Sequence, residues 1–286
     1  MMNLIKLEGC SLKKYQQEIL GIATEVIKVF EKEDIKYSLT GGSTLGAIRH
    51  GGFIPWDDDI DINIPRDDYD KFLQIFDKYL GDDYYIQTPL NSPQIGLLLT
   101  QIRKKNTVAK RKYDLYEDEK KCGISIDLYV VENVFNNKFL RWIQIYLSLF
   151  FAFMVSCNRT FKNRKIPKEV FNEESRKPKF GLLKYIVGFL FQVIPLRVYV
   201  KITEYLFSLC KDKNSKYVSV PSGRKHFNGE LELREKLCKY RKNKFENQFF
   251  NIPFYAEEYL SKFYGNYMEI PSEKEREQHV FLKLKY

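Results

Sequence analysis

Four aspartates gather in one short stretch of the sequence. They are Asp57, Asp58, Asp59 and Asp61. Carboxylates so close together repel one another strongly unless a cation lies among them. The stretch is therefore a candidate metal site before anything else is known about the chain.

The residues around the last two aspartates alternate between polar and apolar. Ile60, Ile62 and Ile64 occupy every second position, the period of a strand with one apolar face. The same alternation places Asp59 and Asp61 side by side on the other face. Carboxylates are the hard oxygen ligands that Mg²⁺ or Mn²⁺ prefers, and Mg²⁺ usually completes its shell with water and substrate phosphate. A phosphate-bearing substrate is therefore expected.

A glycine-rich turn precedes this strand. Gly41, Gly42 and Ser43 lie between a short apolar strand candidate at 35–39 and a helical stretch at 45–49. Glycines permit a close backbone approach, and free N–H groups at a helix start attract anions. Alone, the segment is an ordinary strand-to-helix turn, but the acidic strand behind it favours a phosphate cradle.

A third acid interrupts a later apolar run. Asp127 is the single charged residue in the β-branched segment 124–131, which is typical of a buried strand. A buried Asp needs a partner, either hydrogen-bond donors in the core or a metal ion shared with Asp59 and Asp61. We adopt the metal interpretation.

The string around the aspartates resembles the LicD-type transferases, a family that includes bacterial phosphocholine transferases and, more remotely, the fukutin-related proteins of animals. The resemblance is carried by Gly41-Gly42-Ser43, Leu45-Gly46-Ala47, Arg49, the segment 52–61 (GFIPWDDDID), Pro65-Arg66 and Asp68-Tyr69. It is looser at 102–107, at 123–128 and from Tyr264 to His279. Residues 136–240 carry little of it.

The resemblance implies a fold, and the length permits it. The family's fold is an α/β (α+β) nucleotidyltransferase-like core, here a mixed sheet with flanking helices. A chain of 286 residues has room for a second lobe. We expect a catalytic core at 1–135, a mainly helical, basic lobe at 136–240, and a C-terminal segment at 241–286 that completes the core.

The resemblance also implies an activity. It is the transfer of phosphocholine, or a related phospho-alcohol, from a CDP-linked donor to a hydroxyl of a cell-surface glycan precursor of capsule, lipopolysaccharide or teichoic acid, some of them lipid-linked. Asp59, Asp61 and Asp127 would hold Mg²⁺ or Mn²⁺, and Asp127 would accept the proton of the attacking hydroxyl. Gly42 and Ser43 would fix the phosphate.

The sequence departs from the family pattern after Asp127, where a proline and an acid often found there are missing. Phosphoethanolamine, glycerol phosphate or ribitol phosphate could therefore replace phosphocholine. Two further functions stay open: a nucleotidyltransferase that moves NMP from an NTP, and a catalytically silent nucleotide- or glycan-binding module.

Other side chains near the motif have two interpretations each. Arg49 and Arg103 are candidate phosphate clamps or structural salt bridges to the aspartates. Trp56 offers a π face to a quaternary ammonium or simply packs. Asp57 and Asp58 orient the metal-binding carboxylates or cap the loop, and we favour the first.

The net charge of +10 is unevenly distributed. Residues 159–179 hold eight Lys/Arg against three Glu, and residues 211–244 hold eleven against four acids. A basic lobe suits a nucleotide donor, a phosphorylated acceptor or an anionic membrane, and it is also compatible with a solvated surface that has no partner. We do not expect a nucleic-acid partner.

Apolar segments at 143–157 and 185–196 each fall short of the ~20 residues that cross a bilayer. They are either buried helices or an interfacial hairpin beside the basic stretch at 159–179.

The N-terminus lacks the hydrophobic run of a secretory signal, and the five cysteines lack a Cys-x-x-Cys pair. We expect a cytoplasmic protein, either free or peripheral at the inner face of the cell membrane.

Two amphipathic helices are expected to flank the site. The first has apolar residues at helical spacing, with Ser11 as its N-cap, and the second follows Pro65 and Asp67. The stripe of the first is Leu12, Tyr15, Ile19, Ile22, Val26 and Phe30; that of the second is Tyr69, Phe72, Leu73, Phe76 and Leu80.

Overall fold

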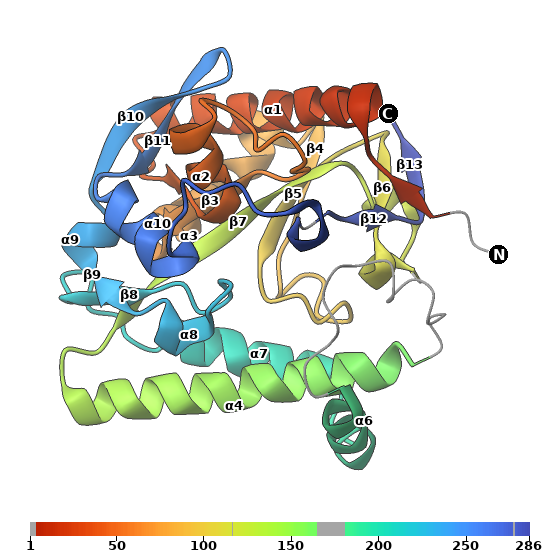
Figure 1. Cartoon of the computed structure of the whole chain (residues 1–286). Helices are drawn as coiled ribbons and strands as arrows, with labels where there is room; N and C mark the ends of the chain where they lie inside the picture. The colour runs from red at the N-terminus through yellow and green to blue at the C-terminus, as the bar shows by residue number, and fades with distance from the viewer. Residues whose placement is uncertain (1–3, 116, 165–180, 277) are drawn as a thin grey trace.

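The structure is a computed structural model that describes residues 4–115, 117–164, 181–276 and 278–286 (Figure 1). The basic stretch predicted at 159–179 lies outside the described residues from 165 onward.

A mixed sheet forms the centre of the molecule, which confirms the predicted α/β class. Its strands follow the order β2–β3–β7–β5–β4, with β8 and β9 added at the end of β7. Only β3 and β7 are parallel; their neighbours run antiparallel. The strands are β2 (Ser38–Leu39), β3 (Asp61–Pro65), β4 (Tyr84–Gln87), β5 (Thr100–Lys104), β7 (Ser125–Val134), β8 (Tyr217–Ser219) and β9 (Glu232–Leu233).

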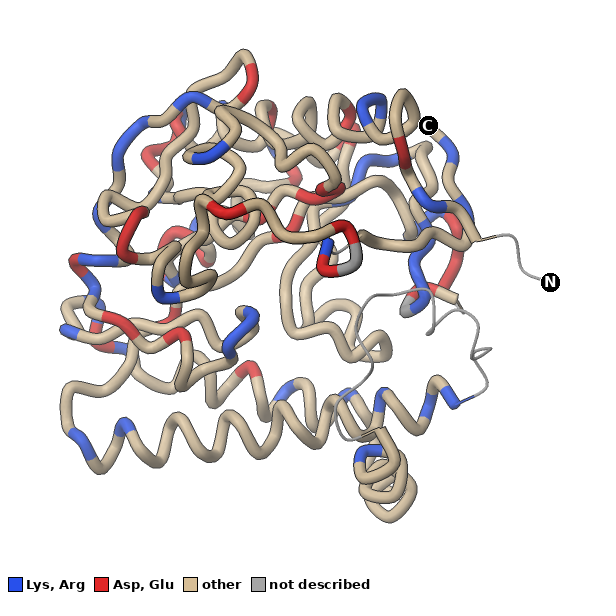
Figure 2. The backbone as a smooth tube through the Cα atoms, viewed as in Figure 1, with Lys and Arg blue, Asp and Glu red and all other residues tan. Residues whose placement is uncertain are grey.

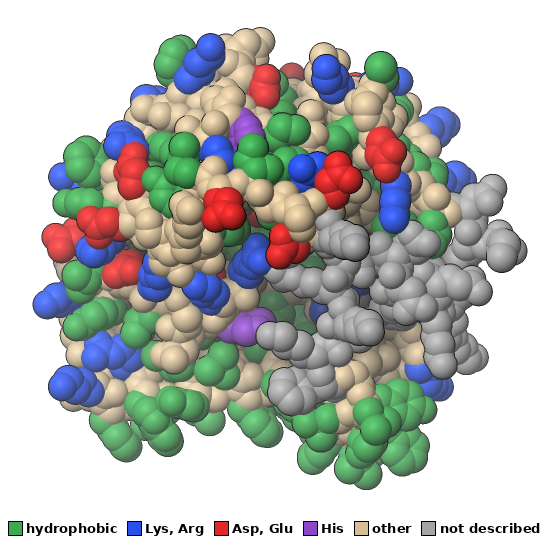
Figure 3. All heavy atoms as spheres, viewed as in Figure 1, with side chains coloured by type: hydrophobic (Ala, Val, Ile, Leu, Met, Phe, Trp, Pro, Cys, Tyr) green, Lys and Arg blue, Asp and Glu red, His purple; other side chains and the backbone are tan. Residues whose placement is uncertain are grey.

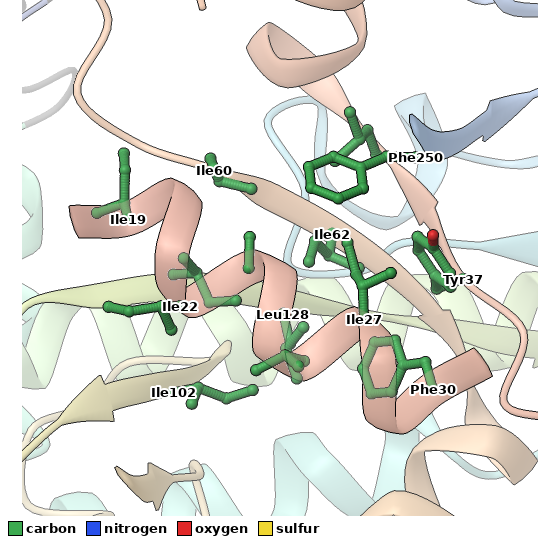
Figure 4. Close-up of a cluster of buried hydrophobic side chains, with 14 of the residues drawn as sticks. Ile19, Ile22, Ile27, Phe30, Tyr37, Ile60, Ile62, Ile102, Leu128 and Phe250 are labelled. Atoms are coloured by element: carbon green, nitrogen blue, oxygen red, sulfur yellow. The ribbon is translucent and has the colours of Figure 1, made fainter. Parts of the chain in front are cut away.

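Helices α1 (Gly9–Lys32) and α3 (Arg66–Leu80) pack against the sheet and form its main core. Figure 4 shows apolar side chains of α1 against Ile60 and Ile62 of the acidic segment and Leu128 of β7. The Phe30 and Phe72 rings meet edge to face with centroids 4.9 Å apart and join α1 to α3. The apolar faces of β3 and β7 are therefore fixed, and their polar residues must point the other way.

The predicted stripe of α1 is buried at all six positions. Ser11, however, is not the N-cap. Glu8 is, and Ser11 stands at the third helical position, where its hydroxyl accepts the Glu8 N–H at 3.1 Å in a capping box. In α3, Leu73 is 37% exposed, so this position of the predicted stripe was wrong, while the other four are buried.

The C-terminal segment returns to the N-terminal half of the chain. Strands β10 (Tyr240–Phe245) and β11 (Gln248–Pro253) form a hairpin, and helix α10 (Ala256–Tyr264) follows it. Strand β12 (Val280–Phe281) pairs with β1 (Ile5–Lys6), and β13 (Lys283–Lys285) pairs with β6 (Val108–Lys110). Phe245, Phe250 and Phe281 belong to the same buried cluster as α1.

Helices dominate the lower part of the molecule in Figure 1. They are α4 (Lys138–Lys162), α6 (Gly181–Leu190), α7 (Leu196–Phe207) and α8 (His226–Gly229), while α9 (Arg234–Leu237) stands higher, at the left side of the view beside β9. Short 3₁₀ turns lie at Lys112–Asp114, Glu119–Lys121 and Glu273–Glu275. The three-part division at 136 and 241 stays a prediction, and within its middle part β8 and β9 join the central sheet.

The apolar segment predicted at 143–157 is part of a longer helix. Helix α4 has 25 residues and is, by length and composition alone, long and apolar enough to cross a membrane. The segment at 185–196 instead covers the second half of α6, the turn at 191–195 and the first residue of α7. Only α4 meets this criterion among the described residues, and core helices of soluble proteins can meet it too.

Helix α2 (Gly41–Arg49) stands directly before the acidic strand, and a glycine lets it pack there. A Cβ added at Gly46 would lie 2.4 Å from the Gly52 carbonyl oxygen. A side chain at this position would push α2 away from the loop that enters β3.

We therefore expect Gly46→Ala to lower the free energy of unfolding by about 1–3 kcal/mol, because the contact is with backbone that cannot move aside. The matched control is Gly21→Ala inside α1, where an added Cβ meets nothing within 4 Å. That variant should be more stable by about 0.4–1 kcal/mol. Urea unfolding of both proteins checks this; equal stabilities would contradict the packing argument.

Candidate active site

A cleft of about 540 Å³ opens beside the polar face of β3 and β7. Its wall combines α2, the acidic loop, α10 and the C-terminal segment. Acidic residues at its base are Asp57, Asp59 and Asp61; aromatic and basic residues around it include Arg49, Trp56, Tyr129, Arg224, Tyr259, Phe263, Tyr264, Tyr267, Arg276 and His279.

The two predicted acidic strands lie next to each other. Asp61 of β3 and Asp127 of β7 are register partners in the parallel pair, so their side chains leave the same face of the sheet. The Asp127 N–H donates to the Ile60 carbonyl at 3.0 Å. Asp59 lies two residues before Asp61 and lines the cleft with it. Asp127 is partly buried beside them and is not among the lining residues.

The carboxylates of this cluster repel one another. Burial, and then the charges of Asp59, Asp127 and Asp57, raise the pKa of Asp61 well above its ordinary value. One oxygen of Asp61, Oδ1, is buried without a hydrogen-bond partner among the described residues. An unpartnered buried carboxylate oxygen surrounded by other carboxylates fits a bound cation.

Helix α2 begins against these carboxylates. Gly41 has a φ of +54°, and a Cβ there would lie 3.3 Å from Asp61 Oδ2. A Cβ at Gly42 would lie 2.8 Å from Asp57 Oδ2. The two glycines therefore allow the helix start and the acidic residues to share one small space, and both line the cleft.

Two residues of the predicted phosphate cradle, Gly41 and Ser43, form hydrogen bonds within the protein. The Ser43 hydroxyl accepts the Asp61 N–H at 2.9 Å, which fixes the start of β3. The Gly41 N–H donates to the Tyr259 hydroxyl of α10 at 3.0 Å. Ser43 is buried and is not among the lining residues.

His279 joins the acidic cluster from the other end of the chain. Its Nδ1 lies 2.6 Å from Asp58 Oδ1 and 4.0 Å from Asp59 Oδ2. Burial and the charge of Arg111 lower the pKa of His279, but Asp58 raises it above its ordinary value. Burial raises the pKa of Asp58, but the His279 imidazole lowers it below its ordinary value. Atoms of these three residues lie within 4.8 Å of one another, so they too could hold a metal ion.

Arg111 supplies a second positive charge that sequence reasoning missed. Burial opposes its charged form, but the Tyr15 hydroxyl and the carboxylates of Asp58, Asp127 and Asp59 raise the pKa of Arg111 above the ordinary value. The guanidinium lies 5.4 Å from the centroid of the Phe281 ring. His279 belongs to the C-terminal stretch that loosely resembles the family, but its place beside Asp58, like that of Arg111, is visible only in the folded chain.

Asp57 and Asp58 have different surroundings. Burial, then Asp59 and Asp58, raise the pKa of Asp57 well above its ordinary value. The Asp57 carbonyl accepts the Gln16 side-chain amide at 2.8 Å, which ties the acidic loop to α1. Asp57 and His279 line the cleft, whereas Asp58 is buried, is not among the lining residues and contacts the His279 imidazole.

The two predicted phosphate clamps both bind protein groups. Arg49 lines the cleft and donates to the carbonyls of Tyr267 and Glu269 at 2.7 and 3.0 Å. Arg103 is 3% exposed, is not among the lining residues, and forms a salt bridge to Asp114 at 3.1 Å. Its partner is thus none of the four clustered aspartates.

Arg103 and Asp127 are linked through one glutamine. Arg103 donates to Gln101 Oε1 at 2.6 Å, and Gln101 Nε2 donates to Asp127 Oδ1 at 2.7 Å. Because the guanidinium holds the amide oxygen, the Gln101 amide group must point its N–H toward the carboxylate. Arg103 therefore helps to orient Asp127 from outside the cleft.

Trp56 lines the cleft but already holds a cation. The Arg276 guanidinium lies 4.3 Å from the centroid of its ring, a cation–π distance.

Glu230 is a further carboxyl of the cleft that sequence reasoning did not identify. Burial raises its pKa to about 7, although its carboxylate accepts the Lys225 N–H at 2.9 Å.

Comparisons with known proteins confirm the resemblance to the LicD family. Residues 34–88 match the family model described as LicD/FKTN/FKRP, nucleotidyltransferase domain. The chain is 25% identical to the lipopolysaccharide cholinephosphotransferase LicD of Haemophilus influenzae, over 94% of this chain and 96% of that protein.

Two further similarities are shorter. The chain is 50% identical to the human ribitol 5-phosphate transferase FKRP over 18% of this chain and 11% of that protein. It is 42% identical to an uncharacterized protein of Rickettsia typhi over 29% of each. Together with the first relative, the transferase similarities support an enzyme of the phosphotransferase type.

The repulsion within the cluster leads to a prediction for Asp61→Asn. Without metal, the variant should be as stable as the parent or more so, because one buried negative charge is gone. A gain of 1 kcal/mol corresponds to about 2–4 °C in Tm for a chain of this size class. With Mg²⁺ or Mn²⁺, Tm should rise for the parent and not for the variant.

The matched control for this thermal-shift measurement is Asp82→Asn, which changes an exposed aspartate in the turn after α3. It should keep the metal-induced rise of the parent. An Asp61→Asn protein that is still stabilised by Mn²⁺ as strongly as the parent would exclude Asp61 as a ligand.

Proposed function

We propose that this LicD-type protein transfers phosphocholine, or a related phospho-alcohol, from a CDP-linked donor to a hydroxyl of a cell-surface glycan precursor, such as one of lipopolysaccharide, capsule or teichoic acid. The observation that carries the proposal is the register pair Asp61 and Asp127: Asp61 lines the cleft together with Asp59 and the glycine-rich helix start, and Asp127 lies next to Asp61 on the same face of the sheet. The two transferase relatives, one named for phosphocholine and one for ribitol 5-phosphate, support the kind of group transferred.

The proposed metal ligands are Asp59, Asp61 and Asp127. A bound Mg²⁺ or Mn²⁺ would neutralise negative charge on the transferring phosphoryl group and on the departing CMP. The unpartnered Asp61 Oδ1 and the mutual repulsion of the cluster support this assignment. Asp59 also belongs to the set formed with Asp58 and His279, so the proposed site has a neighbouring group of ligand atoms.

Asp127 is the proposed proton acceptor for the attacking hydroxyl. Gln101 donates to its Oδ1, which leaves Oδ2 to take the proton of the acceptor. Gly42 would place its N–H toward the donor phosphates from the start of α2. Direct displacement at the phosphorus atom requires charge stabilisation and in-line positioning, which these groups would supply without a covalent intermediate.

The alcohol of the donor would lie among the aromatic residues of the cleft. Tyr259, Tyr264 and Tyr267 line it near the helix start. A quaternary ammonium at Trp56 would have to replace Arg276 on the ring, whereas an uncharged polyol would not compete with that cation. Arg49 is proposed to hold the 267–269 loop in place, since its guanidinium binds two carbonyls there.

The proposed location is the cytoplasm or the inner face of the cell membrane. All five cysteines are free, in keeping with a reducing compartment. The alternative function is transfer of NMP from an NTP, which the nucleotidyltransferase description of the matching family model favours.

One assay separates these functions. Purified protein with Mg²⁺ and an acceptor glycan is incubated with CDP-choline, CDP-ethanolamine, CDP-glycerol, CDP-ribitol or an NTP. We expect CMP from one of the CDP-alcohols, and a loss of at least about 100-fold in Asp127→Asn. Pyrophosphate from an NTP would instead establish the alternative, and release of neither product would contradict catalysis.

The Arg103–Gln101–Asp127 chain predicts a positioning effect. Gln101→Leu should lower kcat by about 10–100-fold, because Asp127 loses the donor that orients it. The KM for the CDP-alcohol should change little, since Gln101 is not among the residues that line the cleft.

The control is Gln17→Leu on the exposed face of α1, which should leave kcat unchanged. Thermal unfolding of both variants separates a lost orientation from a lost fold. If Gln101→Leu raised KM and left kcat unaltered, the role assigned to this hydrogen bond would have to be abandoned.

A further inference from the structure

Helices α4 and α6 present a surface of exposed apolar side chains, here called the α4–α6 face. Figure 3 shows these side chains along the lower edge of the molecule, under the helices labelled in Figure 1. The members from α4 are Phe139, Leu140, Trp142, Tyr146, Leu147 and Phe150; those from α6 and the turn after it are Leu182, Leu183, Tyr185, Ile186, Phe189, Leu190, Phe191, Val193 and Ile194. Each of them is at least 41% exposed.

These residues recur at helical spacing. Phe139, Trp142, Tyr146 and Phe150 follow one another at intervals of three or four and form an outward stripe on α4. A stripe of large aromatic residues in water is unfavourable, and contiguous exposed apolar patches of this kind mark a surface that meets another apolar phase.

The opposite side of α4 is fixed to the protein by polar contacts. Gln144 is fully buried, and its amide donates to the carbonyls of Asn133 and Phe207 at 3.1 and 3.2 Å. Ser148 is buried on the same side. A helix held along its length in this way cannot be surrounded by lipid, because the buried Gln144 amide would lose its partners. We therefore treat α4 as lying along a surface.

Helix α6 is packed tightly onto α4. A Cβ added at Gly188 would lie 2.3 Å from the Cys157 carbonyl oxygen, so the two helices touch backbone to backbone at this point. Apolar residues of α6 therefore lie on the outside because its inner side is occupied by α4. The packing of α6 on α4 therefore fixes the position of the α4–α6 face.

The charges on these elements have one sign. Helix α4, helix α6 and the turn after α6 (138–162 and 181–194) contain five Lys/Arg and no Asp or Glu. The cations are Lys138, Arg141, Arg159, Lys162 and Lys184. Figure 2 shows blue positions at both ends of α4 and on α6, with no red positions along either helix.

We propose that the α4–α6 face docks the protein on an anionic lipid bilayer, with both helices lying in the plane of the interface. Apolar side chains would enter the acyl region, while the surrounding lysines and arginines would meet the negative headgroups. A second copy of the chain would bring the lysines and arginines of these helices toward like charges, which disfavours this face as a homodimer interface. The docking does not depend on the catalytic proposal, because it uses none of the cleft residues.

The chain contains its own optical probe for this test. Of its two tryptophans, Trp142 is in the proposed face and Trp56 is in the cleft, so Trp56→Phe leaves one reporter. We expect a blue shift of Trp142 emission when vesicles of phosphatidylcholine with phosphatidylglycerol are added. Pure phosphatidylcholine vesicles should give a much smaller shift, and high salt should reverse most of the binding.

Matched variants show whether the face itself is responsible. Phe189→Glu should weaken co-sedimentation with the anionic vesicles by about tenfold or more, because a charge replaces an inserted ring. Phe249→Glu is the control: it changes a ring that is at least as exposed, 66% against 54% for Phe189, on the β10–β11 hairpin. It should bind as the parent does.

Three results would overturn the proposal. One is no binding of the parent to either vesicle; another is equal loss in Phe189→Glu and Phe249→Glu. The third is a parent dimer in sedimentation velocity that Phe189→Glu converts to monomer while vesicle binding is absent, which would assign the face to a second copy. Circular dichroism of each variant establishes that it is folded.

Discussion

The arrangement of the site depends on the repulsion between carboxylates that the fold buries together. Asp61 and Asp127 are brought side by side by the pairing of two parallel strands, whose apolar faces are held by α1. The core therefore decides where the charges point, and the charges cannot move apart without breaking the register. The free-energy cost of burying these like charges together is most simply offset by a cation that the cluster binds.

Other parts of the fold serve the same small region. The glycines at the start of α2 make room for the carboxylates, and the Ser43 hydroxyl fixes the backbone of Asp61. The last segment of the chain packs against the first helix and brings His279 to Asp58. These contacts join residues more than 200 positions apart, so the cleft is complete only when both ends of the chain are folded.

Local patterns predicted those parts of the structure that local physics determines. Alternation located β3, a β-branched apolar run located β7, helical periodicity located α1 and α3, and the LicD resemblance is confirmed by the comparisons. Sequence could not show that the Arg103 guanidinium turns to Asp114, or that Arg111 and His279 enter the acidic cluster, because these outcomes depend on long-range packing. Ser11 was placed wrongly because Glu8 also forms a capping pair with it.

The central claim is that Asp59, Asp61 and Asp127 together hold a divalent cation. Anomalous diffraction from a crystal of the protein grown with Mn²⁺ and a CDP-alcohol tests it directly. The account predicts a manganese peak within ligand distance of about 2.0–2.4 Å of carboxylate oxygens from all three residues. A peak held only by Asp58 and His279, or a well-ordered cleft without manganese, would contradict it.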